Sequence, residues 1–230
     1  MDSSSKTETP ATGSYKTTPR TRMRRLPKRA HYDRETVHGI LDAGFVCHVG
    51  YAIDGQPYVT PTTYWRHEDR VYWHGSSASR MLRNIAAGVP VCFTVTHIDG
   101  FVMARSGFHH SVNYRSVMAL GVAQAVTDAA EKEQALDAFI ERLFPGRTGE
   151  LRPSTKQELK GTLVVGMDLA EVSAKVRTGP PVDDEPDYAL PVWAGVLPIR
   201  TTFGPPESDP LLAPGIPVPD YLAGFALDTK

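Results

Sequence analysis

Short segments in which apolar and polar residues alternate recur along this chain, separated by tight turns. They cover residues 45–53, 57–65, 70–75, 89–98, 101–108, 114–126 and 162–169. Asp54-Gly55 and Asp99-Gly100 have the composition of two-residue hairpin turns. Consecutive strands joined in this way pair antiparallel, and with few helices between them the sheet tends to close into a barrel. The sequence therefore predicts a mostly β fold, α+β by content.

A few helices are expected around this sheet. Asp33 and Ser79 are suitable N-cap residues for two short helices, which end near Gly44 and Gly88. Residues 131–144 have apolar side chains at helical spacing, with Leu136, Phe139, Ile140 and Leu143 on one face, and a further short helix is expected near 156–160.

The length of 230 residues fits one folded domain with tails. We divide the chain into a disordered N-terminal tail over residues 1–22, a folded domain over 23–200 and a proline-rich extended arm over 201–230. The arm is either a linker or a segment that packs on a partner through Leu211, Leu212, Tyr221 and Phe225.

Composition excludes several classes of protein. The formal net charge is −1, so no global field attracts nucleic acid, and no apolar run approaches the roughly 20 residues needed to cross a bilayer. Cys47 and Cys92 lie in apolar alternating segments, which favours buried, reduced thiols over a disulfide. No histidine stands at ligand spacing from them, so no metal site is expected. A cytoplasmic protein with neither a nucleic-acid nor a membrane partner is predicted.

The segment YWHGSSASR, residues 72–80, is the first candidate site. A strand ends at His74-Gly75, a hydroxyl-rich loop follows, and a helix begins at Ser79 with Arg80 in its first turn. Backbone N–H groups, hydroxyls and a bidentate guanidinium are typical ligands of a phosphate. The alternative is an ordinary capped helix with a solvated arginine.

The second candidate is ARSGFHHSVNYRSV, residues 104–117, which places many polar residues between two apolar strands. Such groups are costly beside a core unless they are paired or bind a ligand. His109 and His110 do not form a metal clamp if the segment is extended, because neighbouring side chains then point to opposite faces. The alternative is a solvated loop.

Together these motifs carry a resemblance. HGSxxSR followed by HHSxNYRSV, with RAHYDRETVHGILDAG, YVTPTTYW and the stretch from SAKVRTGPP to PVWAGVLP, resembles the pyridoxamine 5′-phosphate oxidase-related flavin-nucleotide-binding proteins, which include nitroimidazole-resistance reductase-like proteins. The resemblance implies a six-stranded antiparallel split β-barrel that dimerises and holds FMN at the interface between two copies.

The resemblance also implies the cofactor residues. Ser79 and Arg80 match phosphate contacts, the strand residues Thr62 to Trp65 match a segment beside the flavin ring, and Trp193 matches the tryptophan of a C-terminal Trp-Gly-Gly motif. The full set is Thr62, Thr63, Tyr64, Trp65, His74, Gly75, Ser76, Ser79, Arg80, Asn113, Tyr114, Arg115, Ser116, Lys175 and Trp193. For any one of the aromatic residues, packing in a core or an interface is the favoured alternative.

Two departures separate the chain from the true oxidases. Met81 replaces the lysine that follows the phosphate arginine, and PIRTTFGPP stands where the family has an Arg-x-His substrate motif, so pyridoxamine phosphate is not the expected substrate. The leading hypothesis is a flavin-dependent oxidoreductase that reduces a small acceptor, with His74 or His110 as the candidate catalytic residue. The alternatives are a flavin or haem carrier or sensor without turnover, with an axial ligand from the histidine-rich segment, and a deazaflavin-dependent reductase.

Overall fold

An antiparallel sheet of ten strands organises the part of the chain that the computed structural model describes, residues 13–222 and Phe225. The strands are β1 (Ala30–His31), β2 (Val46–Ile53), β3 (Gln56–His67), β4 (Arg70–Ser76), β5 (Pro90–Met103), β6 (Ser111–Val122), β7 (Gln124–Ala125), β8 (Thr162–Asp168), β9 (Glu171–Arg177) and β10 (Gly195–Pro198). The α-helices are α1 (Arg34–Asp42), α2 (Arg80–Ala86), α3 (Ala129–Leu143) and α4 (Lys156–Gly161). The 3₁₀ turns are η1 (Pro27–Arg29), η2 (Gly107–His109), η3 (Arg147–Glu150), η4 (Glu185–Ala189) and η5 (Asp220–Leu222).

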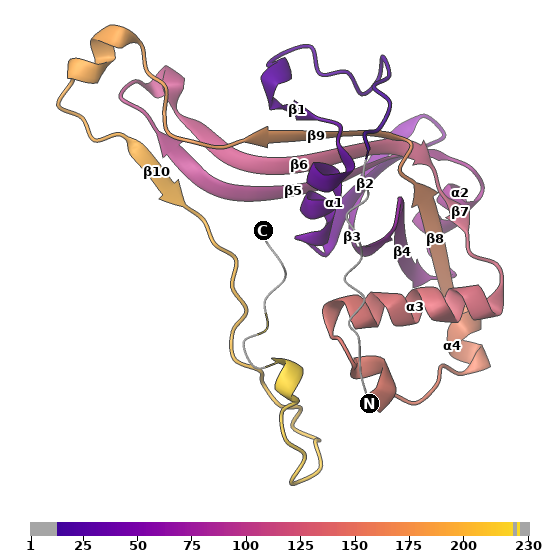
Figure 1. Ribbon diagram of the computed structural model, residues 1–230. Helices are drawn as coiled ribbons and strands as arrows, with labels where there is room; N and C mark the ends of the chain where they lie inside the picture. Colours follow the sequence, from indigo (N-terminus) through magenta and orange to yellow (C-terminus); the bar gives the residue numbers. More distant parts are fainter. Residues whose placement is uncertain (1–12, 223–224, 226–230) are drawn as a thin grey trace.

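The strands curl into a half-barrel in the order β1-β9-β6-β5-β2-β3-β4-β8-β7 (Figure 1). β10 pairs with the far end of β5, on the same edge as β2. The predicted antiparallel, β-rich fold with a few peripheral helices is confirmed. The sheet has ten strands in the described residues, and the predicted number of six is not confirmed. In the described residues, no helix is both long and apolar enough to cross a membrane.

Two hydrophobic cores hold the half-barrel together. The main core lies on the inner face of the sheet against α1 and α2, and its largest buried side chains include Tyr64, Trp73 and Phe93. A smaller core lies on the opposite face beneath α3, where Trp65 and Val164 meet Leu136 and Phe139. The amphipathic helix predicted around residues 131–144 therefore covers only one part of the outer face.

Local sequence explains where the two helices nearest the candidate site begin. The side chain of Asp33 accepts the backbone N–H of Thr36 at 2.8 Å, and the hydroxyl of Ser79 accepts that of Leu82 at 3.4 Å. Each bond satisfies an N–H group that the first helical turn leaves without a partner. Both predicted N-caps are confirmed.

The two predicted Asp-Gly turns have different outcomes. Asp54 and Gly55 both have positive φ values, 52° and 78°, and connect β2 to β3 as a tight hairpin turn. The turn predicted at Asp99-Gly100 is wrong, because β5 continues through it to Met103 with only a shift in register against β6. Glycine is needed at position 100 because β10 passes so close that a Cβ there would lie 2.9 Å from the carbonyl oxygen of Leu197.

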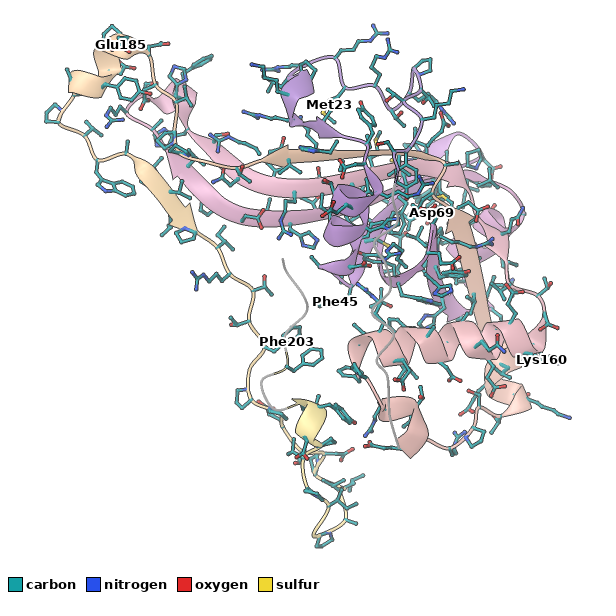
Figure 2. All side chains as sticks on the ribbon, in the orientation of Figure 1. Met23, Phe45, Asp69, Lys160, Glu185 and Phe203 are labelled. Carbon is teal, nitrogen blue, oxygen red and sulfur yellow. The ribbon has the colours of Figure 1, made fainter. Side chains whose placement is uncertain are left out.

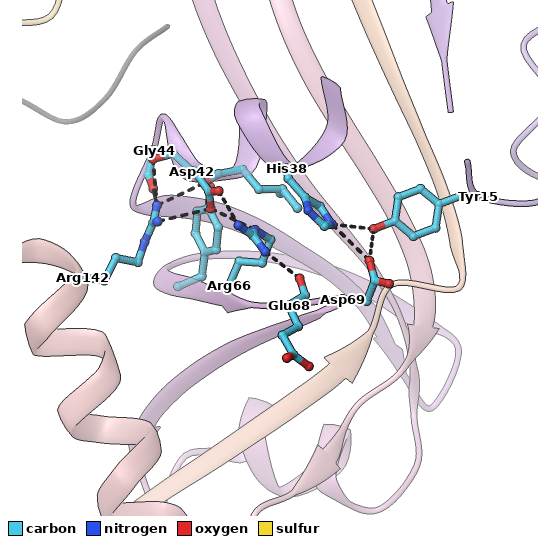
Figure 3. A network of polar contacts seen from close by, with 10 residues as sticks. Tyr15, His38, Asp42, Gly44, Arg66, Glu68, Asp69 and Arg142 are labelled. Atoms are coloured by element: carbon cyan, nitrogen blue, oxygen red, sulfur yellow. Dashed lines mark hydrogen bonds and ion pairs between the residues drawn. The ribbon is translucent and has the colours of Figure 1, made fainter. Parts of the chain in front are cut away.

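Residues 13–22, which the sequence placed in a disordered tail, pack on the half-barrel. Tyr15 is buried, and its hydroxyl donates to Asp69 at 2.6 Å and lies 2.8 Å from Nε2 of His38 (Figure 3). Arg34 also donates to Asp69, at 2.8 Å. Because Asp69 is distant in the sequence, composition alone did not reveal this attachment. Residues 1–12 lie outside the described part of the chain.

The end of the arm beyond residue 200 returns to its own chain. The hydroxyl of Tyr221 donates to Glu150 at 3.0 Å, and Phe225 lies 5.5 Å from Phe144 between ring centroids. Phe203 approaches Phe45, with centroids 6.4 Å apart (Figure 2). Pockets of 460 and 600 Å³ lie along the arm, the larger one against η3. They are formed by the packing of the arm and lie away from the predicted site residues.

Both cysteines are free thiols, and we expect both to react slowly. Burial raises the pKa of Cys47 to about 12 and also raises the pKa of Cys92. The reactive thiolate is therefore scarce at pH 8, and Cys47 is in addition inaccessible. Labelling kinetics with a thiol reagent, before and after unfolding, measure this. Rapid reaction of both thiols in the native protein would contradict their placement in packed strands.

Candidate functional site

One part of the outer sheet face is left uncovered by the described residues. We call it the open face; it consists of Val46 and His48 on β2, Val59, Pro61 and Thr63 on β3, and Thr94, Thr96 and Ile98 on β5. Register places these side chains on one side, because residues directly opposite each other in paired strands share a face. Val59 is 68% exposed. An exposed apolar strip of this kind is typical of a binding surface.

His74 lies where the open face meets the smaller core. The last residue pair between β3 and β4 is Tyr64 with Trp73. Thr63 and His74 are the neighbouring residues just beyond this pair. The imidazole packs between Trp65 and Phe139, with centroid distances of 5.8 and 5.2 Å, and its Nδ1 is buried without a hydrogen-bond partner. Burial lowers the pKa of His74. The ring is therefore neutral near pH 7 and suited to accept a proton or a hydrogen bond rather than to act as an imidazolium acid.

The loop between β4 and α2 presents Arg80 at the surface. Its guanidinium lies over the ring of Tyr58, 4.9 Å from the centroid, and has no carboxylate partner in the described part of the chain. Tyr58 in turn stacks on Tyr51 at 5.5 Å. The hydroxyl of Ser76 accepts the N–H of Ala78 at 3.2 Å, so it stabilises the loop. The guanidinium of Arg80 therefore lies against an aromatic surface, and no carboxylate of the described residues neutralises its charge.

The predicted site residues on β3 lie on two opposite faces of the sheet. Thr63 belongs to the open face, whereas Thr62 points to the inner side with Tyr64. Tyr64 is buried in the main core and donates to the carbonyl of Leu41 at 2.5 Å, while Trp65 is buried in the smaller core. Packing in a core was the alternative interpretation of the aromatic residues. The structure shows this packing for Tyr64, Trp65 and Trp73. Any contact from Tyr64 or Trp65 to a ligand would involve the backbone.

The predicted residues on β6 and β9 form a second group. Ser116 is directly opposite Lys175, whose Nζ lies 6.0 Å from the ring centroid of Tyr114. Asn113 is buried, donates to the carbonyl of Gly179 at 3.1 Å and accepts a hydrogen bond from Arg177. The second group therefore offers one accessible cation, Lys175.

Arg115, and Arg177 near it on β9, are both engaged within the fold. The guanidinium of Arg115 forms a bidentate pair with Asp99, with distances of 2.9 and 3.0 Å. Arg177 is buried, and burial together with the nearby Arg29 lowers its pKa. Both arginines serve the fold in this structure, so the free positive charge comes from Arg80 and Lys175.

The two groups lie apart within one chain. β3 and β6 are separated by β2 and β5, and three strand spacings correspond to about 14 Å along the sheet. Trp193 lies farther away, just before β10, and is 66% exposed (Figure 1). Gly75 packs on α2, where an added Cβ would lie 3.1 Å from Leu82. The predicted residues therefore form separate parts of a site in a single copy.

The far ends of β5 and β6 project beyond the half-barrel together with a C-terminal segment (Figure 1). We call residues 99–113 and 178–198 the wing; Glu185, labelled in Figure 2, lies near its tip. The buried carboxylate of Asp183 accepts the backbone N–H of Arg105 at 2.9 Å and its guanidinium at 3.1 Å. His109 and His110 belong to the loop that this contact fixes.

Sequence reasoning missed His48 and Asp183. The alternation of residues 45–53 placed Cys47 and Val49 inside, so the outward position of His48 beside an outward Val46 was a usable signal. Asp183 gave no such signal, because its partner Arg105 is 78 residues away.

Comparisons with known proteins indicate which group of proteins the chain resembles. The family model for pyridoxamine 5′-phosphate oxidase matches residues 33–176. The flavocytochrome Anf3 from Azotobacter vinelandii is 48% identical, with 91% of this chain and 98% of that chain covered and a TM-score of 0.87. The FAD and haem binding protein from Mycobacterium smegmatis is 36% identical, with coverage of 88% and 99% and a TM-score of 0.84.

A candidate 5-nitroimidazole antibiotic resistance protein from Bacteroides thetaiotaomicron shares the fold, with 22% identity, coverage of 64% and 86%, and a TM-score of 0.52. No curated protein sequence matches the chain.

Proposed function

The chain belongs to the pyridoxamine 5′-phosphate oxidase family, and from this membership and the geometry of the site we propose that it binds a flavin nucleotide along the open face. The flavin ring would lie on the apolar strip of β2 and β3, with its phosphate against Arg80. The observation that carries the proposal is the exposed guanidinium of Arg80, which has no carboxylate partner in the described residues and lies over Tyr58, on the inner side of the part of β3 that β4 leaves unpaired.

The chemistry of the site fits the two ends of such a ligand. A phosphate needs charged, directional donors, and an arginine fork provides two parallel hydrogen bonds. A planar heterocycle needs a flat apolar surface, which the outward valines and threonines of β2, β3 and β5 provide. Lys175, at the other edge of the sheet, is the second accessible cation.

FMN and FAD share the ring, the ribityl chain and the first phosphate, so the site described here suits both. The family resemblance of the sequence implies FMN. The Mycobacterium smegmatis relative is named for FAD, and its identity of 36% over most of both chains favours the dinucleotide. We propose that the ligand is FAD. The open face and Arg80 would recognise the part of FAD that corresponds to FMN.

An oxidoreductase is the activity that follows from this proposal. When bound, a flavin supplies the two-electron chemistry by which a hydride from a reduced nicotinamide passes to a small acceptor. The residues of this chain would orient the ring and exclude water from one of its faces. His74, held neutral at the border of the open face, would accept a hydrogen bond or a proton from the bound molecule.

Haem is the second cofactor that we propose. The family match ends at residue 176, about three quarters of the way along the chain, whereas both haem-linked relatives match about nine tenths of it. They must therefore share part of the C-terminal extension that the family model lacks. A flavocytochrome contains both cofactors by definition, so the sequence-based alternatives of flavin and haem combine here into one proposal.

A homodimer completes the site in this proposal. The wing carries exposed apolar side chains, including Phe108, which is 92% exposed, and Trp193. Exposed groups of this kind mark protein interfaces. In a two-fold dimer, one self-complementary surface creates two equal sites, and the wing of one copy would cover the open face of the other.

Mass analysis of the released cofactors tests the proposal directly. FAD or FMN in the purified protein, with a flavin absorbance that bleaches on addition of NADH or NADPH, is the expected result. A deazaflavin mass would replace the flavin in the proposal. Protein that takes up neither flavin nucleotide would overturn it.

The Arg80→Ala substitution should weaken flavin binding far more than it destabilises the fold. A charged bidentate contact contributes roughly 1.5–3 kcal/mol, so the dissociation constant should rise roughly 10- to 100-fold. Fluorescence titration of the apoprotein with FMN and FAD measures this. Arg152→Ala, which removes an exposed arginine paired with Glu158, is the matched control and should leave affinity unchanged. Equal dissociation constants for the two variants would refute the role of Arg80.

A further inference from the structure

The histidine loop of the wing is built by the C-terminal extension. Asp183 belongs to the part of the chain beyond the family match and is inaccessible to solvent. Its carboxylate accepts hydrogen bonds from both the backbone N–H and the guanidinium of Arg105. The extension therefore holds Arg105 in place, at the start of the loop that leads to the two histidines.

Ser106 in turn orients His110. The ring Nδ1 of His110 lies 2.9 Å from the carbonyl oxygen of Ser106. A carbonyl oxygen only accepts hydrogen bonds, so Nδ1 carries a proton, and in the neutral form of the ring Nε2 carries the lone pair. His110 is exposed, and its Nε2 has no hydrogen-bond partner in the described residues. A neutral imidazole whose Nδ1–H is held by a backbone carbonyl has the arrangement common to metal-ligating histidines.

The neighbouring histidine differs in this respect. Nε2 of His109 lies 3.3 Å from the carboxylate of Asp184, so its outer nitrogen is already engaged. Of the pair, only His110 presents an oriented and free nitrogen. The two residues therefore provide a matched comparison within one loop.

The surface around His110 suits a large apolar ring. Phe108 stands two residues away and is 92% exposed, and Val182, next to Asp183, is 69% exposed. Exposed aromatic and aliphatic side chains in water are unfavourable, and a porphyrin face would cover them. The dimer proposed above would enclose the other face of the ring.

We propose that the wing is a haem site and that Nε2 of His110 would ligate the haem iron. This inference rests on the haem binding proposed above and adds the ligand and the location. It also gives the C-terminal extension a role, because Asp183 positions the loop from which His110 projects. Haem supplies an iron that accepts single electrons; the chain supplies the ligand, its orientation and an apolar surface.

Haem titration of the full-length protein, followed by the Soret band, tests the ligand. The His110→Ala variant should lose haem affinity at least about 10-fold and show an altered Soret maximum, because an iron ligand is removed. The His109→Ala variant should bind haem as the wild type does. Flavin content and circular dichroism of both variants report whether the fold is retained.

A rescue experiment separates ligation from a structural effect. In the His110→Gly variant, added imidazole should restore the wild-type Soret spectrum, because the free base can occupy the vacated ligand position. Unchanged haem affinity and spectrum in His110→Ala would overturn the inference, as would loss of haem in His74→Ala with His110→Ala unaffected. Wild-type protein that takes up no haem would overturn both the haem proposal and this inference. If the wild type binds haem and the His110→Ala variant binds it equally well, only the assignment of His110 is overturned.

Discussion

The Arg142→Met substitution should lower the free energy of unfolding by about 3 kcal/mol. Arg142 connects α3 to the end of α1, where its Nη2 donates to the carbonyls of Asp42 at 2.9 Å and Gly44 at 2.8 Å (Figure 3). Nη1 lies 3.3 Å from the carboxylate of Asp42. The substitution keeps the side-chain volume but leaves these acceptors without their donor and removes a cation from the C-terminal end of a helix.

Thermal and denaturant unfolding at one fixed protein concentration measure the effect. A loss of this size corresponds to a decrease in Tm of about 6–12 °C for a domain of this length. The matched control is Arg152→Met, because Arg152 is also paired with a carboxylate but its side chain is 67% exposed, compared with 17% for Arg142. An exposed pair contributes little, so the control should unfold as the wild type does. Equal effects of the two substitutions would show that Arg142 does not hold α3 in place.

Local patterns determined the features that were predicted correctly. Two-residue alternation identified the strands, and short-range hydrogen bonds placed the N-caps Asp33 and Ser79. The same reasoning brought Arg80 to the surface at the start of α2, because only the neighbouring residues decide that position. These features depend on residues a few positions apart, so a single sequence contains the required information.

Long-range contacts determined the features that were not predicted. Gly100 was interpreted as a turn residue, but the close approach of β10 explains the glycine, and β10 comes almost one hundred residues later. Arg115 was assigned to the cofactor, but the register shift in β5 places Asp99 beside it. Tyr15 joins Asp69 across 54 positions. In each case the partner is chosen by the folded sheet and not by the local sequence.

The second large effect concerns the sharing of the flavin site between two chains. Arg80 lies at the start of α2 and Trp193 just before β10, and these elements lie at opposite ends of the molecule (Figure 1). Neither residue is needed for the core, since both are exposed. In the proposed dimer, Arg80 of one copy and Trp193 of the partner subunit contribute to the same site. Homodimers of Arg80→Ala and of Trp193→Ala should therefore both bind flavin weakly.

Mixing the two variants should then restore binding. After subunit exchange of equal amounts, about half of the dimers are heterodimers, and each contains one site with neither substitution, so about a quarter of all sites should regain full affinity. Light scattering establishes the dimer, differently tagged chains establish the exchange, and flavin fluorescence counts the restored sites. A mixture of Arg80→Ala with itself, carrying the two tags, controls for effects of exchange alone. If exchange is complete and no high-affinity sites return, Arg80 and Trp193 do not contribute to one site across the dimer, because residues that act within a single chain cannot complement each other in this way.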